Sequence, residues 1–351
     1  MPKIEILRPT DLTDAQIQTW RAIQLNTPTY HSPYYSPEYI QTLYTFLPQT
    51  EIAHISDGSQ HAFFPYHRQP DGHAMPPGIC ISDYQGPVQP LDFFYDPISI
   101  LKAAEIRSIH FNHLPYTLIH LHPYIECPHP DLSPRICLTQ GIEPYIAHLK
   151  STSSLIENIE RKTRKIQREV GTFTFTFDNL DADSLTRTLQ LKSAQYKATQ
   201  KEDIFAPHLP FTAIMRQLHA TRTPTFQGVL STLYIHDRLI AAHFGMIYHH
   251  TYHIWFPTYD PEFEKYSPGL ILLHQILLAF PSQRLTILDF GKGHDSYKLR
   301  FMNDAVPLAH GYIEPTTPRK IRRRFSQVTR RILSPLKPYL QPLLNRNRPK
   351  K

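Results

Sequence analysis

The amino-acid sequence predicts an α/β (α+β) fold of two units in tandem, each a mixed central sheet with flanking helices. Two observations carry this prediction: the 351 residues exceed what one hydrophobic core usually supports, and one order of hairpin, helix and strand occurs twice. Hydrophobic residues make up 41% of the chain and charged residues 19%, as in a folded rather than a disordered protein. We expect the units at 1–150 and 151–314, followed by a basic helical tail at 315–351.

Each unit is predicted from a β-hairpin that is followed by a helix and a further strand. The hairpin at 51–67 turns at Asp57-Gly58, and the hairpin at 231–248 turns at Asp237-Arg238, each between short apolar runs. A shift of 180 residues aligns four identities, in which Ile55, Asp57, Ala62 and Phe64 match Ile235, Asp237, Ala242 and Phe244. The helices and strands that follow are expected at 97–110 and 116–122, and at 266–280 and 285–291.

Between the hairpins, residues 154–170 are expected to form an amphipathic helix. Ser154 and Glu157 have the spacing of a capping box, and Gly171 marks the C-terminal end. The polar face carries five cations, which are Arg161, Lys162, Arg164, Lys165 and Arg168. Such a face is usually just solvated, but it could steer an anionic ligand. A strand is expected at 172–178 from its alternating pattern, and two more helices at 189–201 and 211–221.

The cysteines and the apolar runs indicate the cellular compartment of the protein. Cys80, Cys127 and Cys137 are an odd number without C-x-x-C spacing, which argues against a disulfide framework and a zinc knuckle. The N-terminus has no apolar signal-type segment, and no apolar run reaches the roughly 18 to 20 residues of a membrane span. We therefore expect a cytoplasmic protein.

The net charge of +7 is concentrated in the tail. Residues 315–351 contain 12 Lys or Arg and no Asp or Glu, whereas the other 314 residues carry 25 basic and 30 acidic side chains. Ile321, Phe325, Val328 and Ile332 form a helical apolar stripe among these cations. This pattern favours peripheral binding of residues 316–351 to an anionic membrane at its inner face. Nonspecific contact with nucleic acid and a plain unstructured tail are the alternatives.

A helix begins at Ser267-Pro268-Gly269, directly after an apolar strand and a polar loop. Serine is a favoured N-cap residue, and proline is favoured in the first turn. The free backbone N–H groups of a helix start suit a pyrophosphate or a carboxylate. The alternative is a helix start that binds nothing.

The next strand ends at Asp289 and leads into Gly291-Lys292-Gly293. In an open α/β sheet, ligands lie beyond the C-terminal ends of neighbouring strands. If the strands that end near Pro257 and at Asp289 are neighbours, Asp289 and the Ser267 turn face one crevice. There a carboxylate could orient or deprotonate an amine or a hydroxyl. Equally, Asp289 could simply cap the glycine-rich turn.

The order of these features resembles a known family. Residues 289–301, DFGKGHDSYKLRF, fit the pattern D-F-G-x-G-x-(D/E)-x-Y-K-x-x-F, and SPYYSPEYI, ISDYQGPV and ENIERKTRKIQREVG precede them in the same order. Together these segments resemble acetyltransferases of the BcsL/CelD type, which are associated with bacterial cellulose and exopolysaccharide biosynthesis. That type belongs to the GNAT superfamily and is related to the Fem-type aminoacyl transferases.

The resemblance implies two GNAT-like units and acyl transfer, with the donor site in the second unit. Acetyl-CoA or a longer acyl-CoA would be the co-substrate, and no metal is expected. Its pyrophosphate and pantetheine would lie against Ser267, Pro268, Gly269 and Leu270. The chain lacks the Q-x-x-G-x-G/A loop of ordinary GNAT enzymes, so another activated acyl carrier stays open.

The resemblance also implies roles for the residues around the crevice. Asp289 would orient or deprotonate the acceptor, Tyr297 would protonate the leaving thiolate, and Lys298 would hold an anionic acceptor or a phosphate. His243 is a second candidate base because neutral imidazole suits that task near neutral pH, although it could be a core histidine. Asp83-Tyr84 of the first unit would line the acceptor side, or form a turn with a packed tyrosine.

The expected activity is direct N- or O-acylation of a sugar or cell-envelope precursor, since no covalent nucleophile stands out. Transfer from aminoacyl-tRNA and a non-catalytic scaffold are the alternatives. His249, His250 and His253 resemble a metal-binding group, but no carboxylate or cysteine accompanies them in the sequence, which favours no metal.

Overall fold

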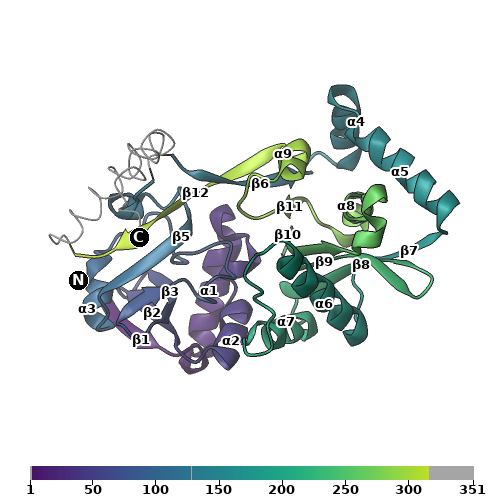
Figure 1. Ribbon diagram of the computed structural model, residues 1–351. Coiled ribbons are helices and arrows are strands. Elements are labelled where there is room, and N and C mark those ends of the chain that lie inside the picture. Colours follow the sequence, from purple (N-terminus) through teal and green to yellow (C-terminus); the bar gives the residue numbers. More distant parts are fainter. Residues whose placement is uncertain (1, 128, 316–351) are drawn as a thin grey trace, which may run out of the picture.

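The computed structural model describes residues 2–127 and 129–315. Within them, the strands form one twelve-stranded sheet in the order β1-β2-β3-β4-β5-β12-β6-β11-β10-β9-β8-β7 (Figure 1). The strands are β1 (Lys3–Leu7), β2 (Thr50–Ser56), β3 (His61–Arg68), β4 (His73–Met75), β5 (Ser108–Pro115), β6 (Asp131–Cys137), β7 (Phe173–Thr176), β8 (Phe226–Ile235), β9 (Arg238–Tyr248), β10 (Thr251–Tyr259), β11 (Ile287–Asp289) and β12 (Asp304–Ile313).

The helices flank this sheet on both faces. The α-helices are α1 (Asp14–Asn26), α2 (Pro37–Phe46), α3 (Ile98–Ala103), α4 (Ile142–Thr152), α5 (Leu155–Glu169), α6 (Ala182–Ala198), α7 (Phe211–Ala220), α8 (Pro268–Gln283) and α9 (Ser296–Phe301). Short 3-10 helices are η1 (Pro9–Asp11), η2 (Pro28–Tyr30), η3 (Pro33–Tyr35), η4 (Ile119–Tyr124) and η5 (Pro261–Tyr266).

The two units have the same plan, as the sequence predicts. In the first unit β2 pairs antiparallel with β3, and in the second β8 pairs antiparallel with β9. Each unit then places a parallel pair beside its hairpin, β4 with β5 and β10 with β11. Each half of the sheet is therefore mixed, and the parallel pair stands at the same place in both.

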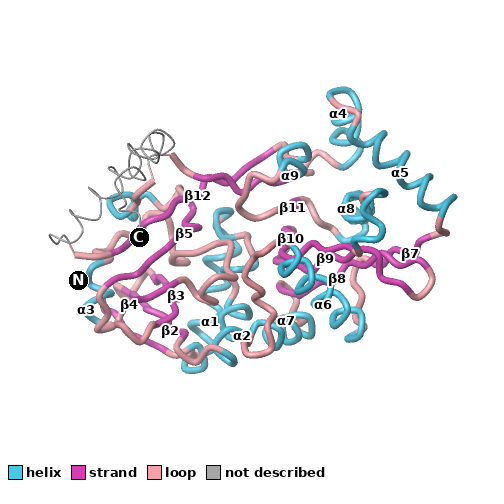
Figure 2. Tube along the Cα trace, viewed as in Figure 1, coloured by secondary structure: helices cyan, strands magenta, loops and turns pink. Residues whose placement is uncertain are grey.

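The units exchange strands at their junction. β12, which ends the described chain, pairs with β5 of the first unit, and β6, which precedes α4, pairs with β11 of the second unit. β12 and β6 also pair with each other, so the two predicted sheets are continuous (Figure 2). The junction is thus built from main-chain hydrogen bonds, which hold the two units in a fixed register.

Two hydrophobic cores stabilise the assembly. One joins buried residues of the first unit to α6, α7 and one face of the second sheet, with Trp20, Tyr39 and Phe244 among them. The other packs α4, α5 and α8 on the opposite face, around Ile166 and Ile276 (Figure 1). Because the first core crosses the junction, the interface between the units is apolar as well as hydrogen-bonded.

Some local predictions are wrong in detail. Residues 116–122 are not a strand, since this apolar run lies between Pro115 and Pro123 and forms η4, while the strand lies earlier, at β5. A short apolar run fits a helix as well as a strand, so its pattern alone did not decide. The helix expected at 97–110 is shorter, at Ile98–Ala103.

The central helix is confirmed, but its capping box is not formed. α5 spans Leu155–Glu169, and Ser154 at its N-cap makes no capping bond; instead its Oγ accepts from Asn158 Nδ2 at 3.0 Å. The predicted tail helix at 316–351 lies outside the described residues. Within those described, no helix is long and apolar enough to cross a membrane.

Candidate active site

The strands that carry the predicted site are neighbours. β10 and β11 run parallel, with His253 opposite Asp289, and β11 ends there while β10 continues to Tyr259. In the described chain, residues 254–259 of β10 thus have no strand partner on the β11 side. A β-bulge at Trp255 marks the start of this free edge. Bulges and free edges are common beside active sites because they leave main-chain groups available.

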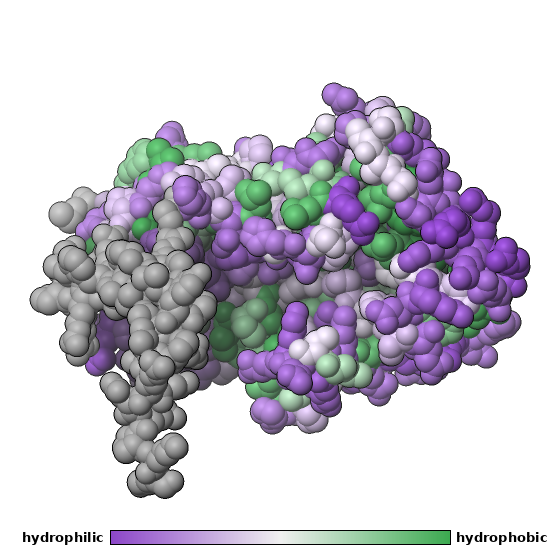
Figure 3. All heavy atoms as spheres, turned by 45° about the horizontal axis from the view of Figure 1, so that its top comes forward, coloured by the Kyte–Doolittle hydropathy of each residue, from purple (hydrophilic) through white to green (hydrophobic). Residues whose placement is uncertain are grey.

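A cavity of about 450 Å³ lies at this free edge. It gathers five of the residues that the sequence singles out: His243, Ser267, Gly269, Leu270 and Tyr297. The other lining residues are Lys192, Gln195, Lys201, Pro257, Thr258, Tyr259, Glu264, Leu273 and Asp295. The space-filling view shows that the surface is hollowed near the middle of the face it presents (Figure 3).

The start of α8 forms one end of the cavity. Ser267 has φ 52° and ψ 57°, a left-handed conformation that costs a non-glycine residue about 1–3 kcal/mol and is often found at functional sites. The N–H groups of Leu270 and Ile271 donate to Ser267 O, whereas that of Gly269 has no acceptor in the described chain. Pro268 has no N–H. The helix start therefore offers one free main-chain donor.

Lys162 supplies a positive charge at the same place. This α5 residue donates from Nζ to Ser267 Oγ at 2.5 Å, across 105 residues of sequence. Lys165, on the next turn, lies over the ring of Tyr266, 5.9 Å from its centroid. The basic face of α5 thus meets the start of α8, where an anion would be held by an N–H group, a hydroxyl and an ammonium group.

The inner wall carries polar groups without partners. His243 is 3% exposed and its Nδ1 has no hydrogen bond, and the Oγ1 of Thr258, 1% exposed, has none either. Burial, with a further effect from Lys192, lowers the pKa of His243 to about 3. The imidazole is therefore neutral near pH 7. Buried polar groups without partners are uncommon, and at a cavity they suit a polar ligand.

Lys192, on α6, and Tyr297, in the first turn of α9, line the same cavity. Lys192 donates from Nζ to Pro257 O on the free edge of β10 at 2.9 Å, and burial lowers its pKa to about 8. Burial also raises the pKa of Tyr297, with the Asp295 carboxylate acting in the same direction. The predicted protonation of the leaving thiolate by Tyr297 stays untested.

Asp289 lies beside the cavity in a buried polar cluster rather than on its wall. It is 2% exposed, and it accepts hydrogen bonds from Tyr84 Oη at 2.5 Å, Ser133 Oγ at 2.8 Å and Gly291 N at 2.8 Å. The carboxylate does cap the turn, and it also ties the first unit to the second. With its oxygens occupied, Asp289 is placed to orient other groups; its predicted role as a base stays untested.

His253 links Asp289 to Asp83 of the first unit. Its Nε2 lies 3.0 Å from Asp83 Oδ2, and its Nδ1 lies 3.5 Å from Asp289 Oδ1. Neutral imidazole has one N–H, so only the doubly protonated ring can donate to both carboxylates. The sequence showed no acidic partner for His253, but the fold brings two to it. Its neighbours His249 and His250 lie in the turn between β9 and β10.

The glycines of the DFGKG stretch permit this packing. Gly291 has φ 68°, and a Cβ on it would lie 2.5 Å from Asp83 Oδ2. Gly293 has φ 144°, and a Cβ there would lie 3.1 Å from Lys298 Nζ. Lys298 itself donates to the carbonyls of Gly291 and Lys292 at 3.3 and 3.2 Å. It therefore supports the turn, and its predicted contact with an anionic ligand stays untested.

Three residues of this region were not identified as site residues from the sequence. Lys162 was only one cation of a solvated face, Lys192 one polar residue of a helix, and His253 part of a histidine-rich turn. No local sequence signal distinguishes these residues, because each is placed at the site by a contact with a residue far along the chain.

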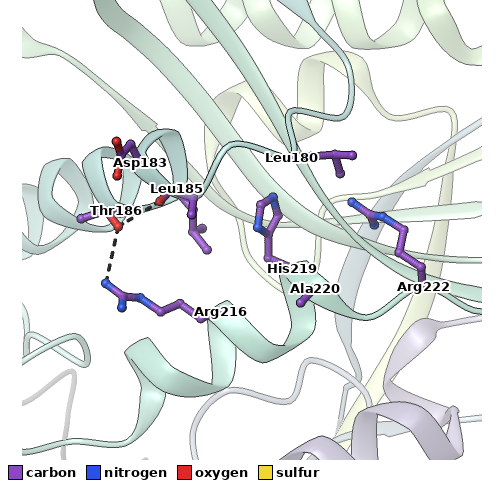
Figure 4. A pocket seen from close by; sticks show the side chains of 9 residues that line it. Leu180, Asp183, Leu185, Thr186, Arg216, His219, Ala220 and Arg222 are labelled. Atoms are coloured by element: carbon purple, nitrogen blue, oxygen red, sulfur yellow. Dashed lines mark hydrogen bonds between the residues drawn. The ribbon is translucent and has the colours of Figure 1, made fainter.

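A second cavity, of about 650 Å³, lies between α6 and α7. Figure 4 shows its basic side chains, and each is already bonded to the protein: Arg216 to Thr186 Oγ1, His219 to Asn179 O and Arg222 to Asp178. None of the predicted site residues lines it. Among the described residues no group of three His, Cys, Asp or Glu side chains could hold a metal.

Comparison with known proteins relates the sequence and the fold of this chain to a class of proteins. Residues 153–299, which include every residue that lines the cavity, match the family model described as an acetyltransferase (GNAT) domain. The fold is accordingly that of a GNAT protein with two units in tandem. A search of curated proteins finds no match.

Solved structures share the fold over nearly the whole chain. One is the C-terminal domain of a protein from Agrobacterium fabrum that is described as a lysylphosphatidylglycerol synthetase. Its TM-score is 0.56 at 11% identity, and the match covers 92% of this chain and 98% of that one. L-PGS from Bacillus licheniformis has a TM-score of 0.55 and 11% identity, covering 85% and 97%. FemX has a TM-score of 0.56 and 12% identity, covering 88% and 96%. At such identities the likeness is one of fold.

Proposed function

We propose that the chain is an acyltransferase that uses acyl-CoA and acylates an acceptor of the sugar or cell-envelope precursor class by direct transfer. The observation that carries the proposal is the cavity at the free edge of β10, which ends at the start of α8. The match of residues 153–299 to the acetyltransferase (GNAT) domain supports the reaction class. The acceptor class rests on the resemblance to the BcsL/CelD type.

The cavity suits each part of an acyl-CoA. The pyrophosphate would meet the Gly269 N–H, Ser267 and Lys162. The pantetheine arm, which carries amide groups, would follow the free edge of β10, where main-chain groups can pair with it. The acyl carbonyl would then lie near the unpartnered His243 and Thr258. No cysteine lines the cavity, and the proposed route is direct transfer without an acyl-enzyme intermediate.

A second candidate is transfer from aminoacyl-tRNA. The basic face of α5 favours it, since Lys162 reaches the cavity entrance and the other cations of that face extend away from it along the helix. A polyanion much larger than CoA could contact the whole face. FemX and L-PGS share the fold, which adds no substrate information by itself.

Isothermal titration tests these candidates against each other. We expect acetyl-CoA or a longer acyl-CoA to bind at one site per chain. The affinity should be higher than that of adenosine fragments of CoA that lack the pantetheine arm. Binding of aminoacyl-tRNA in the absence of any CoA binding would favour the second candidate. If neither acyl-CoA nor aminoacyl-tRNA binds, both candidate functions are wrong, and a non-catalytic scaffold is the remaining alternative.

A further inference from the structure

We propose that Lys192 binds a carboxylate of the donor, so that the cavity takes an acyl group ending in a carboxylate, such as a succinyl group, in preference to an acetyl group. This inference rests on the proposed acyltransferase function and deepens it, because it names the chemical class of the acyl group. It starts from an ammonium group that lines the cavity and has no carboxylate beside it.

The ammonium group of Lys192 has one hydrogen to spare. The side chain is partly buried, and its Nζ donates to Pro257 O at 2.9 Å and to Gln195 Oε1 at 3.1 Å. An ammonium group has three N–H bonds, so a third acceptor can bind. Pro257 stands opposite His243 in the pairing of β10 with β9. The ammonium group therefore lies beside the wall to which we assign the acyl carbonyl.

No carboxylate balances this charge. Among the described residues, no Asp or Glu oxygen lies within 4 Å of Lys192 Nζ, and none lies within 4 Å of Nζ of Lys201, the other lysine of the cavity lining. Two carboxylates do line the cavity. Asp295 lies 3.5 Å from Lys298 Nζ, and Glu264 belongs to η5, next to the start of α8.

Other partly buried cations of the chain do have such a partner. Arg21, Arg68 and Lys292 each lie 2.7 to 2.8 Å from a carboxylate oxygen. Burial of a charge without an opposite charge is unfavourable, so buried charges are usually paired. An unpaired ammonium group on the wall of a cavity therefore indicates that an anionic group of a ligand completes the pair.

Lys192 is charged when the ligand arrives. Burial and the charge of Lys201 lower the pKa of Lys192 to about 8, the Asp295 carboxylate acts in the opposite direction, and Lys298 lowers the pKa further. At pH 7 most chains therefore carry the ammonium form. The neighbouring His243, whose pKa burial lowers to about 3, is neutral and does not compete for the carboxylate.

The position of Lys192 assigns the anionic group to the acyl chain. The phosphates of CoA are proposed to meet Ser267 and Lys162 at the start of α8, and the pantetheine arm is uncharged. Asp83 and Tyr84, which are predicted to lie on the acceptor side, are not among the residues that line this cavity. The acyl chain is thus the part of the substrates next to Lys192, and an anionic acyl chain carries a carboxylate.

Transfer would leave this carboxylate intact. The nitrogen or oxygen of the acceptor attacks the thioester carbonyl, its bond to the carbonyl carbon forms, and the C–S bond breaks. CoA leaves with the electron pair of that bond and ends as the thiol with the proton that the acceptor loses. The carboxylate passes to the product, so a hydroxyl or an amine of the acceptor is replaced by a group with a negative charge.

Titration with matched pairs of acyl-CoAs tests the carboxylate site. Malonyl-, succinyl- and glutaryl-CoA differ from propionyl-, butyryl- and pentanoyl-CoA only by a carboxylate in place of a methyl group. We expect at least one of the acids to bind about tenfold more tightly than its uncharged partner at pH 7, as a hydrogen bond between charged groups allows. Lys192→Met, which removes the charge and keeps an unbranched side chain, should abolish this preference.

Lys197→Met is the matched control, because Lys197 lies on the same helix but pairs with Asp203 and does not line the cavity. It should keep the preference of the wild type. Equal affinities within all three pairs, or a preference that persists in Lys192→Met, would overturn the carboxylate site while the proposed function stands. If none of the six acyl-CoAs binds, the proposed function is wrong as well.

Proton uptake at pH 8 identifies the group that binds the carboxylate. About half of the Lys192 side chains are neutral at this pH, and a bound carboxylate raises their pKa. Binding of the preferred acid should therefore take up as much as about half a proton per chain more than binding of its uncharged partner, measured by isothermal titration in buffers of different ionisation enthalpy. Lys192→Met should remove this difference. Equal uptake for both partners in the wild type would overturn the role of Lys192.

Discussion

The two units share one plan but differ in the connection between their parallel strands. In the second unit, Asp260, the six residues of η5 and Ser267 join β10 to α8, a 16-residue helix whose start lines a cavity. In the first unit β4 has three residues, α3 has six, and a long loop at 76–97 separates them. That loop carries Asp83 and Tyr84 across the junction to His253 and Asp289. One copy of the fold thus forms the cavity at the free edge of β10, and the other contributes side chains to the buried polar cluster beside that cavity.

Removal of the imidazole that joins the copies should have the largest effect. His253→Ala would remove a fully buried imidazole and leave Asp83 Oδ2 without its hydrogen-bond partner, and a cavity of aromatic-ring size together with the lost hydrogen bond costs about 3–5 kcal/mol. We expect a loss of that size in the free energy of unfolding, measured with urea. His250→Ala, in the exposed turn nearby, is the control and should change it little. Equal stability of the two variants would mean that the cluster does not hold the units together.

The close approach of Asp83 to the turn can be tested with a methyl group. Gly291→Ala puts a Cβ 2.5 Å from Asp83 Oδ2 on a residue with positive φ, and we expect a destabilisation of about 2–4 kcal/mol from strain and overpacking together. Gly58→Ala has positive φ too, but nothing lies within 4 Å of its Cβ. It should cost only the backbone term, about 1–2 kcal/mol. If the two costs match, the packing of Asp83 on Gly291 is not tight.

The pH dependence of stability tests whether the His243 ring at the cavity wall is buried in the folded chain. Since the pKa of His243 is lowered to about 3 by burial, the unfolded chain binds its proton first as the pH falls below about 6.5. His243 therefore lowers stability progressively between pH 6.5 and 3, and it has no effect above that window. Between pH 7 and 5, His243→Gln should lose about 2 kcal/mol less than the wild type. An identical pH profile would mean that His243 is hydrated and accessible in the folded chain.

The sequence predicts what depends on neighbouring residues. The turns at Asp57-Gly58 and Asp237-Arg238, the amphipathic pattern of α5 and the Ser-Pro-Gly start of α8 are all local signals, and the structure confirms the elements they define. The condition that the strands ending near Pro257 and at Asp289 are neighbours is also met, since β10 and β11 pair in parallel.

The sequence does not predict the partners that give the site its chemistry. Tyr84 and Asp289 are 205 residues apart, and Lys162 and Ser267 are 105 apart. The exchange of β6 and β12 brings the units together, and nothing in either strand's pattern indicates it.

The affinity of the wild type and of three variants for acetyl-CoA tests most directly whether the donor and acceptor sites come from different units. Lys162→Ala should weaken binding about tenfold, because a charge-assisted hydrogen bond contributes roughly 1.5–3 kcal/mol, while Arg161→Ala, which removes the same charge from the same helix, should have little effect. Asp83→Asn should leave the Kd for acetyl-CoA unchanged, since Asp83 does not line the cavity and is predicted to lie on the acceptor side. Equal affinities in Lys162→Ala and the wild type, or a large loss in Asp83→Asn, would contradict a donor cavity in the second unit and an acceptor site from the first.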